Sequence, residues 1–301
     1  MEKPYGLRSD ASGGLRGAQA PAHGSMTIRE FLRALCSTGV PRNEVRLLLA
    51  HVLHREPAWL VAHDDHEFTI SELEQTHALT ARRAAGEPIA YLLGARDFYG
   101  RSFRCSPAAL IPRPETELLI DRALASLATL ATDAATSVLD VGTGTGCIAI
   151  SIALERPNAM VTAIDISPDA LTLARENAQQ LGAPAAFIQS NWFSALPPDA
   201  RFDLILSNPP YIVPGDAHLT QGDLRFEPPI ALADAVDGLE SYRQLARGAL
   251  LHLKSGGRLI VEHGYDQGES VPALLGKAGL ADVVTHRDLA GHPRVTEARK
   301  P

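Results

Sequence analysis

The chain has 301 residues, 45% of them apolar, and a formal net charge of −7 at pH 7. This length is enough for one large domain and a second, smaller one. The sequence contains no run of 18 apolar residues and no signal-peptide core, so we expect no membrane association. The 3 cysteines lie far apart. They predict neither a disulfide framework nor a metal site, and they fit a cytoplasmic protein.

The negative charge is concentrated in the C-terminal part of the chain. Residues 113–301 carry 15 basic and 23 acidic side chains. An acidic surface repels a phosphate backbone, so we expect no stable nucleic-acid binding. We expect a monomer.

Three segments precede the main pattern of the chain. Residues 1–25 are rich in Gly, Ala, Ser and Pro, which predicts a disordered leader or tag, with Met26 as the natural start. Residues 26–86 have apolar side chains at helical spacing and predict a small helical bundle. Residues 87–113 consist of short apolar runs broken by Gly and Pro, which predict a hairpin linker.

Two capping boxes are expected in the helical segment. Thr27 and Glu30 have the spacing at which a hydroxyl and a carboxylate satisfy each other's backbone N–H groups at a helix start. Ser71 and Glu74 have the same spacing and predict the start of a helix that ends at Gly86.

Residues 114–301 alternate between strand and helix patterns and form the predicted catalytic domain. This alternation predicts an α/β fold with a doubly wound, mainly parallel sheet. We expect helices at 115–130, Cys147–Glu155, from Ser167-Pro168 onward, at 240–253 and at 268–278, and strands at Ser137–Val141, Val161–Ile164, Ala185–Ile188, Phe202–Ser207, Arg258–Glu262, 281–287 and 294–299.

A glycine-rich loop follows the first of these strands. Its residues are Gly142, Thr143, Gly144, Thr145 and Gly146. Glycines let a backbone approach a ligand closely, and the helix that follows offers free N–H groups. Asp165, at the end of the next strand, can accept hydrogen bonds from both hydroxyls of a ribose. The G-x-G-x-G spacing differs from the nicotinamide pattern G-x-G-x-x-G, so an adenosine ligand is predicted without a pyrophosphate cradle.

A second motif, Asn208-Pro209-Pro210-Tyr211, follows the strand Phe202–Ser207. Asn-Pro-Pro also turns a chain, but the carboxyl end of a strand is where open α/β sheets bind ligands. The Asn208 side-chain oxygen and the Pro209 carbonyl can accept the two N–H groups of a planar amide or amino nitrogen. Both prolines fix φ and lack an N–H, and Tyr211 offers a flat face for the planar group. The motif predicts methyl transfer to nitrogen.

Over residues 26–300 the chain closely resembles the HemK-type peptide-chain release factor glutamine methyltransferases (the PrmC family). The stretches that carry the resemblance are GEPIAYLLGARDFYG (86–100), LIPRPETE (110–117), LDVGTGTG (139–146), SNWFSALP (190–197), SNPPYI (207–212), QGDLRFEP (221–228), LIVEHG (259–264) and RVTEAR (294–299). The resemblance implies a class I S-adenosylmethionine methyltransferase fold. This fold is Rossmann-like, with a mainly parallel seven-stranded sheet, a small N-terminal helical bundle that docks the substrate, and a β-hairpin linker.

The resemblance also implies roles for individual residues. The loop from Gly142 to Gly146, together with Asp165 and Asn208, would hold S-adenosyl-L-methionine, and Trp192 would pack against its adenine. The substrate would be the glutamine of the Gly-Gly-Gln motif of bacterial release factors, methylated at its side-chain amide nitrogen. It would be held by the catalytic set Asn208, Pro209, Pro210 and Tyr211.

One position departs from the family pattern, and two other functions stay open. The family usually has Asp before the tryptophan, whereas this chain has Asn191, which accepts a hydrogen bond from adenine as a weaker, neutral partner. The first alternative is an adenine-N6 methyltransferase acting on nucleic acid, because the amino group of adenine is electronically similar. The second is an adenosine-binding interaction protein without enzymatic activity.

Weaker signals stay outside the predicted site. Glu227 and Glu262 either orient loops near the site or have solvated or helix-capping roles, with neither reading favoured. The pairs His51/His54 and His63/His66 have a spacing seen in metal sites but lack cysteine partners, so no metal is expected.

Overall fold

The structure, a computed structural model, describes residues 26–34, 39–129, 135–234 and 236–301. The leader expected at 1–25 lies outside the described residues. The chain divides into two units between His77 and Ala78. In the described part of the chain, no helix is both long and apolar enough to cross a membrane.

The N-terminal unit is helical, as expected. Its helices are α1 (Ile28–Ala34), α2 (Arg42–Leu53), α3 (Trp59–Ala62) and the start of α4 (Ile70–Ala84). One apolar cluster holds this unit together, with Phe31 and Leu49 fully buried at its centre and Phe68 packed edge-on against Phe31. The helices are too short to be stable alone, so this shared core maintains them.

One predicted capping box is confirmed and the other is wrong. At α1, Thr27 and Glu30 exchange hydrogen bonds as expected. At α4 the box is formed by Thr69 and Glu72, whose carboxylate accepts the Thr69 N–H at 2.8 Å. Ser71 instead accepts a bond from Gln75 inside the helix. The cap lies at Thr69 because the helix already begins at Ile70, and the helix ends at Ala84, two residues before Gly86.

A hairpin follows, as the linker pattern predicts, but a short helix that was not expected comes first. The helix α5 (Ile89–Leu93) ends at Gly94, and strands β1 (Ala95–Phe98) and β2 (Arg101–Arg104) pair antiparallel. The two turn residues, Tyr99 and Gly100, both have positive φ, which matches the twist of a two-residue hairpin loop.

The larger unit contains a seven-stranded sheet, which confirms the predicted fold class. Its strands are β3 (Thr136–Val141), β4 (Ala159–Asp165), β5 (Ala185–Gln189), β6 (Phe202–Ser207), β7 (Leu253–Glu262), β8 (Ala281–Arg287) and β9 (Pro293–Arg299). Their order is β5-β4-β3-β6-β7-β9-β8, and β9 runs antiparallel to both its neighbours. From β3 the chain first builds outward to β5 and then crosses to β6 on the other side. The strand order therefore reverses between β3 and β6.

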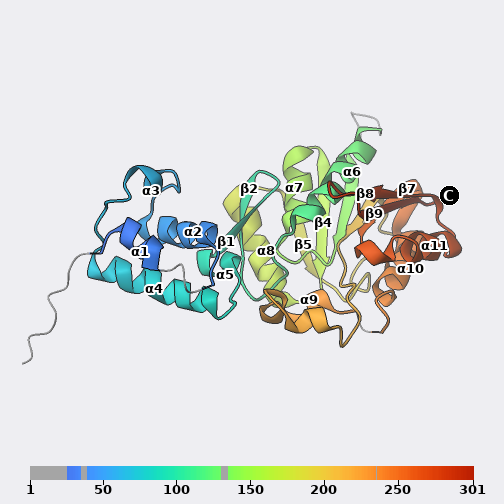
Figure 1. The fold of residues 1–301 in the computed structure, drawn as a ribbon. Coiled ribbons are helices and arrows are strands. Elements are labelled where there is room, and N and C mark those ends of the chain that lie inside the picture. Colours follow the sequence, from blue (N-terminus) through green and yellow to red (C-terminus); the bar gives the residue numbers. More distant parts are fainter. Residues whose placement is uncertain (1–25, 35–38, 130–134, 235) are drawn as a thin grey trace, which may run out of the picture. The chain divides into compact units, whose positions relative to one another are not determined.

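Helices cover both faces of this sheet (Figure 1). One apolar cluster joins α6 (Glu117–Ala128) and α7 (Cys147–Glu155) to the sheet, and α8 (Pro168–Leu181) packs beside α7. A second cluster joins α10 (Glu240–His252) and α11 (Ser270–Lys277) to the opposite face of the sheet, through strand residues such as Leu139 and Ile205. Successive side chains of a strand point to opposite faces, so each central strand contributes to both clusters.

Most expected elements agree with the structure to within two residues, and Ser167 is the N-cap of α8, accepting the Ala170 N–H at 3.2 Å. The largest error is at β7, which begins at Leu253 rather than at Arg258 because it follows α10 without a loop. Within the described residues the pattern also missed four short helical segments: η3 (Ala217–Thr220), η4 (Leu224–Phe226), α9 (Pro229–Leu232) and η5 (Tyr265–Gln267). It did not separate η2 (Pro114–Thr116) from α6.

The position of the second capping box leads to a stability test. Thr69→Ala removes the hydroxyl that accepts the Glu72 N–H, and we expect the free energy of unfolding to fall by about 1 kcal/mol. Ser71→Ala is the matched control and should change it by less than about 0.5 kcal/mol. Urea denaturation followed by circular dichroism measures both. A larger loss for Ser71→Ala would reinstate the sequence-based assignment.

Candidate active site

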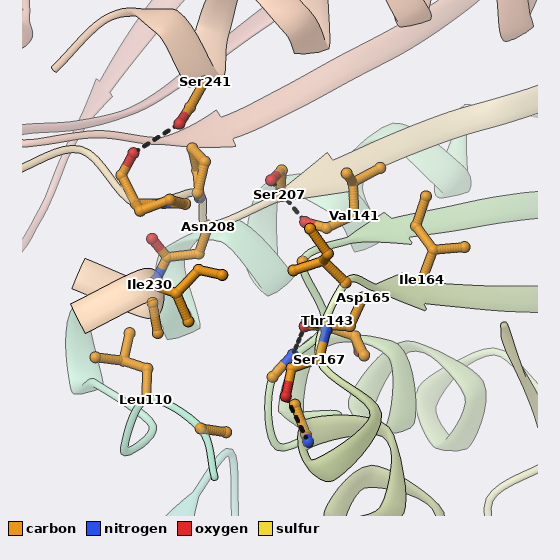
Figure 2. A pocket seen from close by; sticks show the side chains of 18 of the residues that line it. Leu110, Val141, Thr143, Ile164, Asp165, Ser167, Ser207, Asn208, Ile230 and Ser241 are labelled. Carbon is orange, nitrogen blue, oxygen red and sulfur yellow. Dashed lines mark hydrogen bonds between the residues drawn. The ribbon is translucent and has the colours of Figure 1, made fainter. Parts of the chain in front are cut away.

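A pocket opens where the strand order reverses, at the carboxyl ends of β3 and β6. This is the position at which open α/β sheets bind ligands. The Ser207 hydroxyl donates to the Val141 carbonyl at 2.7 Å and joins the two strand ends. The cavity measures about 480 Å³, which is the size of a small-molecule site. Figure 2 shows Asn208 and Ile230 on one side of it and Thr143, Asp165 and Ser167 on the other.

The glycines of the loop have different roles. Gly142, Gly144 and Gly146 all have positive φ, between 55° and 83°, a region that side chains disfavour. A Cβ at Gly142 would meet nothing within 4 Å, and one at Gly144 only Ala109, so both face open space where a ligand can approach the backbone. A Cβ at Gly146 would lie 2.8 Å from Ile150. Gly146 does not line the pocket, and it permits α7 and α8 to pack closely.

Asp165 lies at the end of β4, as expected, and its carboxylate faces the loop. One oxygen accepts the Gly144 N–H and the other the Ser167 N–H, both at 2.9 Å. Burial raises the pKa of Asp165, and these backbone bonds oppose the rise. Each carboxylate oxygen can accept more than one hydrogen bond, so capacity remains for two ligand hydroxyls.

A second buried aspartate, which the sequence analysis did not place at the site, supports the loop from behind. The Asp140 carboxylate accepts the Thr143 hydroxyl at 2.6 Å and the Ala149 N–H at 3.2 Å. It is fully buried, and burial raises its pKa to about 7. Its other oxygen has no hydrogen-bond partner among the described residues. The signal for this role was its position near the end of β3, among Val138, Leu139 and Val141, just before the loop.

The pocket wall after β5 contains Ser190, Asn191 and Trp192. Trp192 has a φ of 51°, an unusual conformation for a large side chain. The Ser190 hydroxyl holds this turn by donating to the Trp192 carbonyl at 2.6 Å. A flat ring and an exposed amide are therefore placed together at one end of the cavity, which suits a planar base.

Asn208 lies at the opposite wall, and only the nitrogen of its side-chain amide has a hydrogen-bond partner among the described residues. Its Nδ2 donates to the Thr116 hydroxyl at 3.1 Å. Its Oδ1 is buried and has no hydrogen-bond partner in the described part of the chain. A buried acceptor without a partner costs about 1–3 kcal/mol, so this oxygen is a ready acceptor for an N–H that enters the pocket.

The other residues of the motif divide into two groups. Pro209 and Pro210 line the pocket, and the Ser241 hydroxyl fixes the Pro210 carbonyl at 2.9 Å. Tyr211 is not among the pocket-lining residues: its ring packs against the core cluster under α10, and burial raises its pKa. The Tyr211 carbonyl accepts a bond from Gln267. Its role in holding a substrate stays a prediction.

Glu227 and Glu262 are not solvated, so that reading of the sequence was wrong: they are 3% and 1% exposed. Glu227 forms an ion pair with Arg113 and accepts the Ile111 N–H at 2.9 Å, which ties the segments RFEP and LIPRPETE together. Arg113 lines the pocket, so this ion pair shapes its wall. Glu262 lies beside Thr116 and Asn208. Charge in a sequence predicts exposure, and only the tertiary fold shows which carboxylates have partners.

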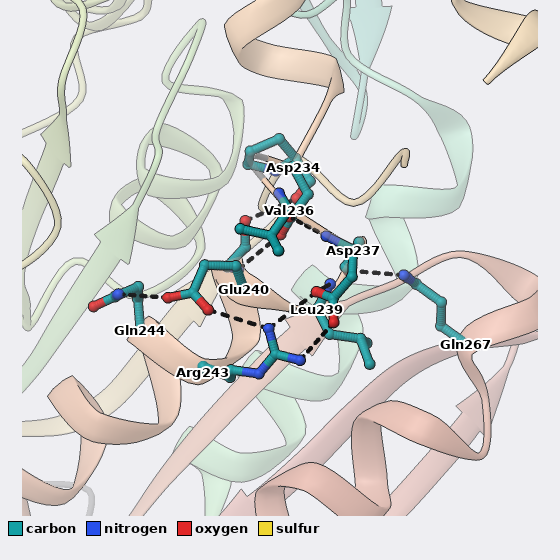
Figure 3. A network of polar contacts seen from close by, with 11 residues as sticks. Asp234, Val236, Asp237, Leu239, Glu240, Arg243, Gln244 and Gln267 are labelled. Atoms are coloured by element: carbon teal, nitrogen blue, oxygen red, sulfur yellow. Dashed lines mark hydrogen bonds and ion pairs between the residues drawn. The ribbon is translucent and has the colours of Figure 1, made fainter. Parts of the chain in front are cut away.

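A polar network fixes the pocket wall that leads into α10 (Figure 3). The Asp234 carboxylate accepts the N–H groups of Val236 at 2.6 Å and Ser241 at 2.9 Å. These bonds lower the pKa of Asp234 although burial raises it. Arg243 pairs with both Asp237 and Glu240. The network holds Ser241 in position to bind the Pro210 carbonyl.

The histidine pairs do not come together as a site. His63 and His66 pack against the Trp59 ring, His63 stacked and His66 edge-on. In the described ranges, no group of three or more His, Cys, Asp or Glu has an arrangement that could hold a metal ion.

The separate roles of the glycines can be measured. Gly142→Ala and Gly146→Ala both strain a positive-φ position, which costs about 1–3 kcal/mol of unfolding free energy. Gly146→Ala also forces a methyl group against Ile150, and we expect a further loss of about 1–3 kcal/mol. Urea denaturation without ligand tests this difference. Equal losses in the two variants would contradict the packing role of Gly146.

Comparison with known proteins agrees with this geometry. Residues 27–94 match the PrmC N-terminal domain, and residues 132–287 match a methyltransferase domain. The release factor glutamine methyltransferase of Bordetella pertussis is 51% identical over 90% of this chain and 98% of its own length. The enzyme of the same name from Escherichia coli is 43% identical over 90% of this chain and 97% of its own.

A solved structure supports the fold independently of close sequence similarity. The methyltransferase domain of delta-N METTL16 aligns with a TM-score of 0.50 at 16% identity, covering 67% of this chain and 89% of that one. At such low identity the likeness shows the class I methyltransferase fold alone. With its close relatives matching almost from end to end, the chain belongs to the release factor glutamine methyltransferase family, whose members depend on S-adenosyl-L-methionine.

Proposed function

We propose that this protein transfers a methyl group from S-adenosyl-L-methionine to the side-chain amide nitrogen of the glutamine in the Gly-Gly-Gln motif of peptide-chain release factors. The observation that carries the proposal is Asn208, which lines the same pocket as the glycine loop and whose buried Oδ1 lacks a partner among the described residues. A transferase for nitrogen needs such an acceptor beside its methyl donor.

The residues of the pocket fit the cofactor. The open space at Gly142 and Gly144 admits its methionine part close to the backbone, and the spare lone pairs of Asp165 suit the ribose hydroxyls. Trp192 and Asn191 would receive the adenine. Bound there, S-adenosyl-L-methionine supplies a methyl group attached to an electron-poor sulfur. The protein therefore has to orient the substrate nitrogen.

The motif after β6 has the groups for this orientation. An amide nitrogen is a poor nucleophile because its lone pair is delocalised into the carbonyl. The Asn208 oxygen and the Pro209 carbonyl would each accept one of its N–H bonds, which pulls the nitrogen away from planarity and frees the lone pair. Ser241 holds the following peptide rigid. Alignment of this kind is worth about 7–11 kcal/mol of the barrier.

The apolar part of the pocket suits the carbon chain of a glutamine. Leu110 and Ile230 lie on the side that carries Asn208 (Figure 2), Pro112 also lines the pocket, and Ile230 is 60% exposed. A side chain entering past these residues would lose water before its amide reaches Asn208. We further propose that the N-terminal helices dock the release factor and that the enzyme acts as a cytoplasmic monomer.

The role of Asn208 gives a direct test. Asn208→Ala removes the acceptor without disturbing the glycine loop, and we expect kcat to fall by about 10²–10³, the usual cost of one preorganised polar group. Affinity for S-adenosyl-L-methionine, measured by calorimetry, should fall far less than kcat, because the glycine loop and Asp165 would still hold the cofactor. The matched control is Asn158→Ala, in an exposed turn before β4. Turnover of Asn208→Ala at the wild-type rate would reject the assignment.

The substrate is tested separately. The purified protein is incubated with labelled S-adenosyl-L-methionine and either a release factor, the same factor with its motif glutamine replaced by alanine, or an adenine-containing DNA duplex. We expect intact-mass analysis to show one added methyl group on the first substrate only. Transfer to DNA alone would establish the adenine methyltransferase instead, and binding without any transfer would favour a non-enzymatic role.

A further inference from the structure

Three polar side chains from distant parts of the sequence meet at the ends of β6 and β7. Ser207 pairs with Val261 in parallel register, so the next residues, Asn208 and Glu262, stand side by side. Thr116, in the turn before α6, completes the group and is 2% exposed. Glu262 does not line the pocket, so it can influence the reaction only through its neighbours.

One hydrogen bond in this group has a defined direction. Asn208 Nδ2 donates to the Thr116 hydroxyl, and the Glu262 carboxylate interacts with both Thr116 and Asn208. A hydroxyl has one proton and two lone pairs. If the Thr116 hydroxyl donates its proton to the Glu262 carboxylate, it can only accept a hydrogen bond from Asn208. The Asn208 amide must then turn its NH₂ toward Thr116 and its oxygen toward the pocket.

The opposite amide orientation would defeat the reaction. With NH₂ facing the pocket, Asn208 would present a donor to the N–H groups of the substrate. We propose that Glu262 is a positioning residue that, through the Thr116 hydroxyl, keeps the Asn208 side-chain oxygen aimed at the substrate amide. This inference rests on the proposed function and assigns a role to a residue that touches neither substrate nor cofactor.

The charge of Glu262 determines the direction of the hydrogen bonds that link Glu262 through Thr116 to Asn208. Burial raises its pKa to about 7. When protonated, the carboxyl donates to Thr116, whose own proton turns to Asn208 and favours the flipped amide. The rate should therefore fall as pH falls through about 7. The charged and titratable groups that face Glu262 are Arg294 of β9, Glu115 of η2, Tyr211 after β6, Tyr242 of α10 and Cys147 of α7.

The test measures kcat at saturating cofactor and release factor. Thr116→Val and Glu262→Met each interrupt the hydrogen bonds that link Glu262 through Thr116 to Asn208. We expect each to lower kcat by about 10- to 100-fold, the scale seen when a residue that supports a site residue is removed. The KM for the release factor and the affinity for S-adenosyl-L-methionine should hardly change. Thr116→Ser keeps the hydroxyl and should retain most of the rate. Glu262→Gln keeps an acceptor but cannot titrate, so the inflection of kcat near pH 7 should become smaller, leaving only the contribution of Asp140, whose pKa is also about 7.

Matched controls separate positioning from folding. Glu297→Gln changes another buried carboxylate of the same sheet, paired with His286, and should leave kcat and its pH profile unchanged. Wild-type kcat in Thr116→Val, or a pH profile of kcat in Glu262→Gln identical to that of the wild type, would overturn the inference. An absence of methylation by the wild-type protein would instead overturn the proposed function, and the inference with it.

Discussion

The pairing of β3 with β6 at the reversal of strand order is the constraint on which the site depends. Because both strands run in the same direction, the glycine loop and the Asn-Pro-Pro segment leave the sheet at the same edge. A cofactor pocket and a substrate acceptor thus share one cavity although more than 60 residues separate Gly142 from Asn208. Apolar contacts on both faces of the sheet hold this edge in place.

The central part of the fold was predictable because its signals are local and strong. Buried parallel strands such as Phe202–Ser207 are short apolar runs, and Ser167-Pro168 is a start signal that needs no tertiary help. The errors fall where local signals compete. Thr69 and Ser71 lie on either side of the first residue of α4, and the local sequence does not show that the helix begins at Ile70 with Thr69 as its cap.

The sequence predicted several residues that line the pocket, but it did not predict the buried carboxylates that hold those residues in place. Asp165 and Asn208 can be recognised because polar residues directly follow apolar strands. Asp140 and Glu262 are as deeply buried as the core around them, and although both follow apolar strand residues, the sequence does not show which groups they contact. Thr143, the partner of Asp140, is only three residues away in the sequence, whereas Thr116 becomes a neighbour of Glu262 only after the sheet has formed.

Cys147 begins α7 directly after the glycine loop and lines the same pocket. Burial raises the pKa of its thiol to about 12, so the sulfur stays protonated at neutral pH. A thiolate, and not a thiol, is the form that attacks carbon. A reactive sulfur in the wall of this pocket would compete with the substrate for the methyl group of the cofactor. In its thiol form Cys147 is a weak nucleophile toward a cofactor bound in this pocket.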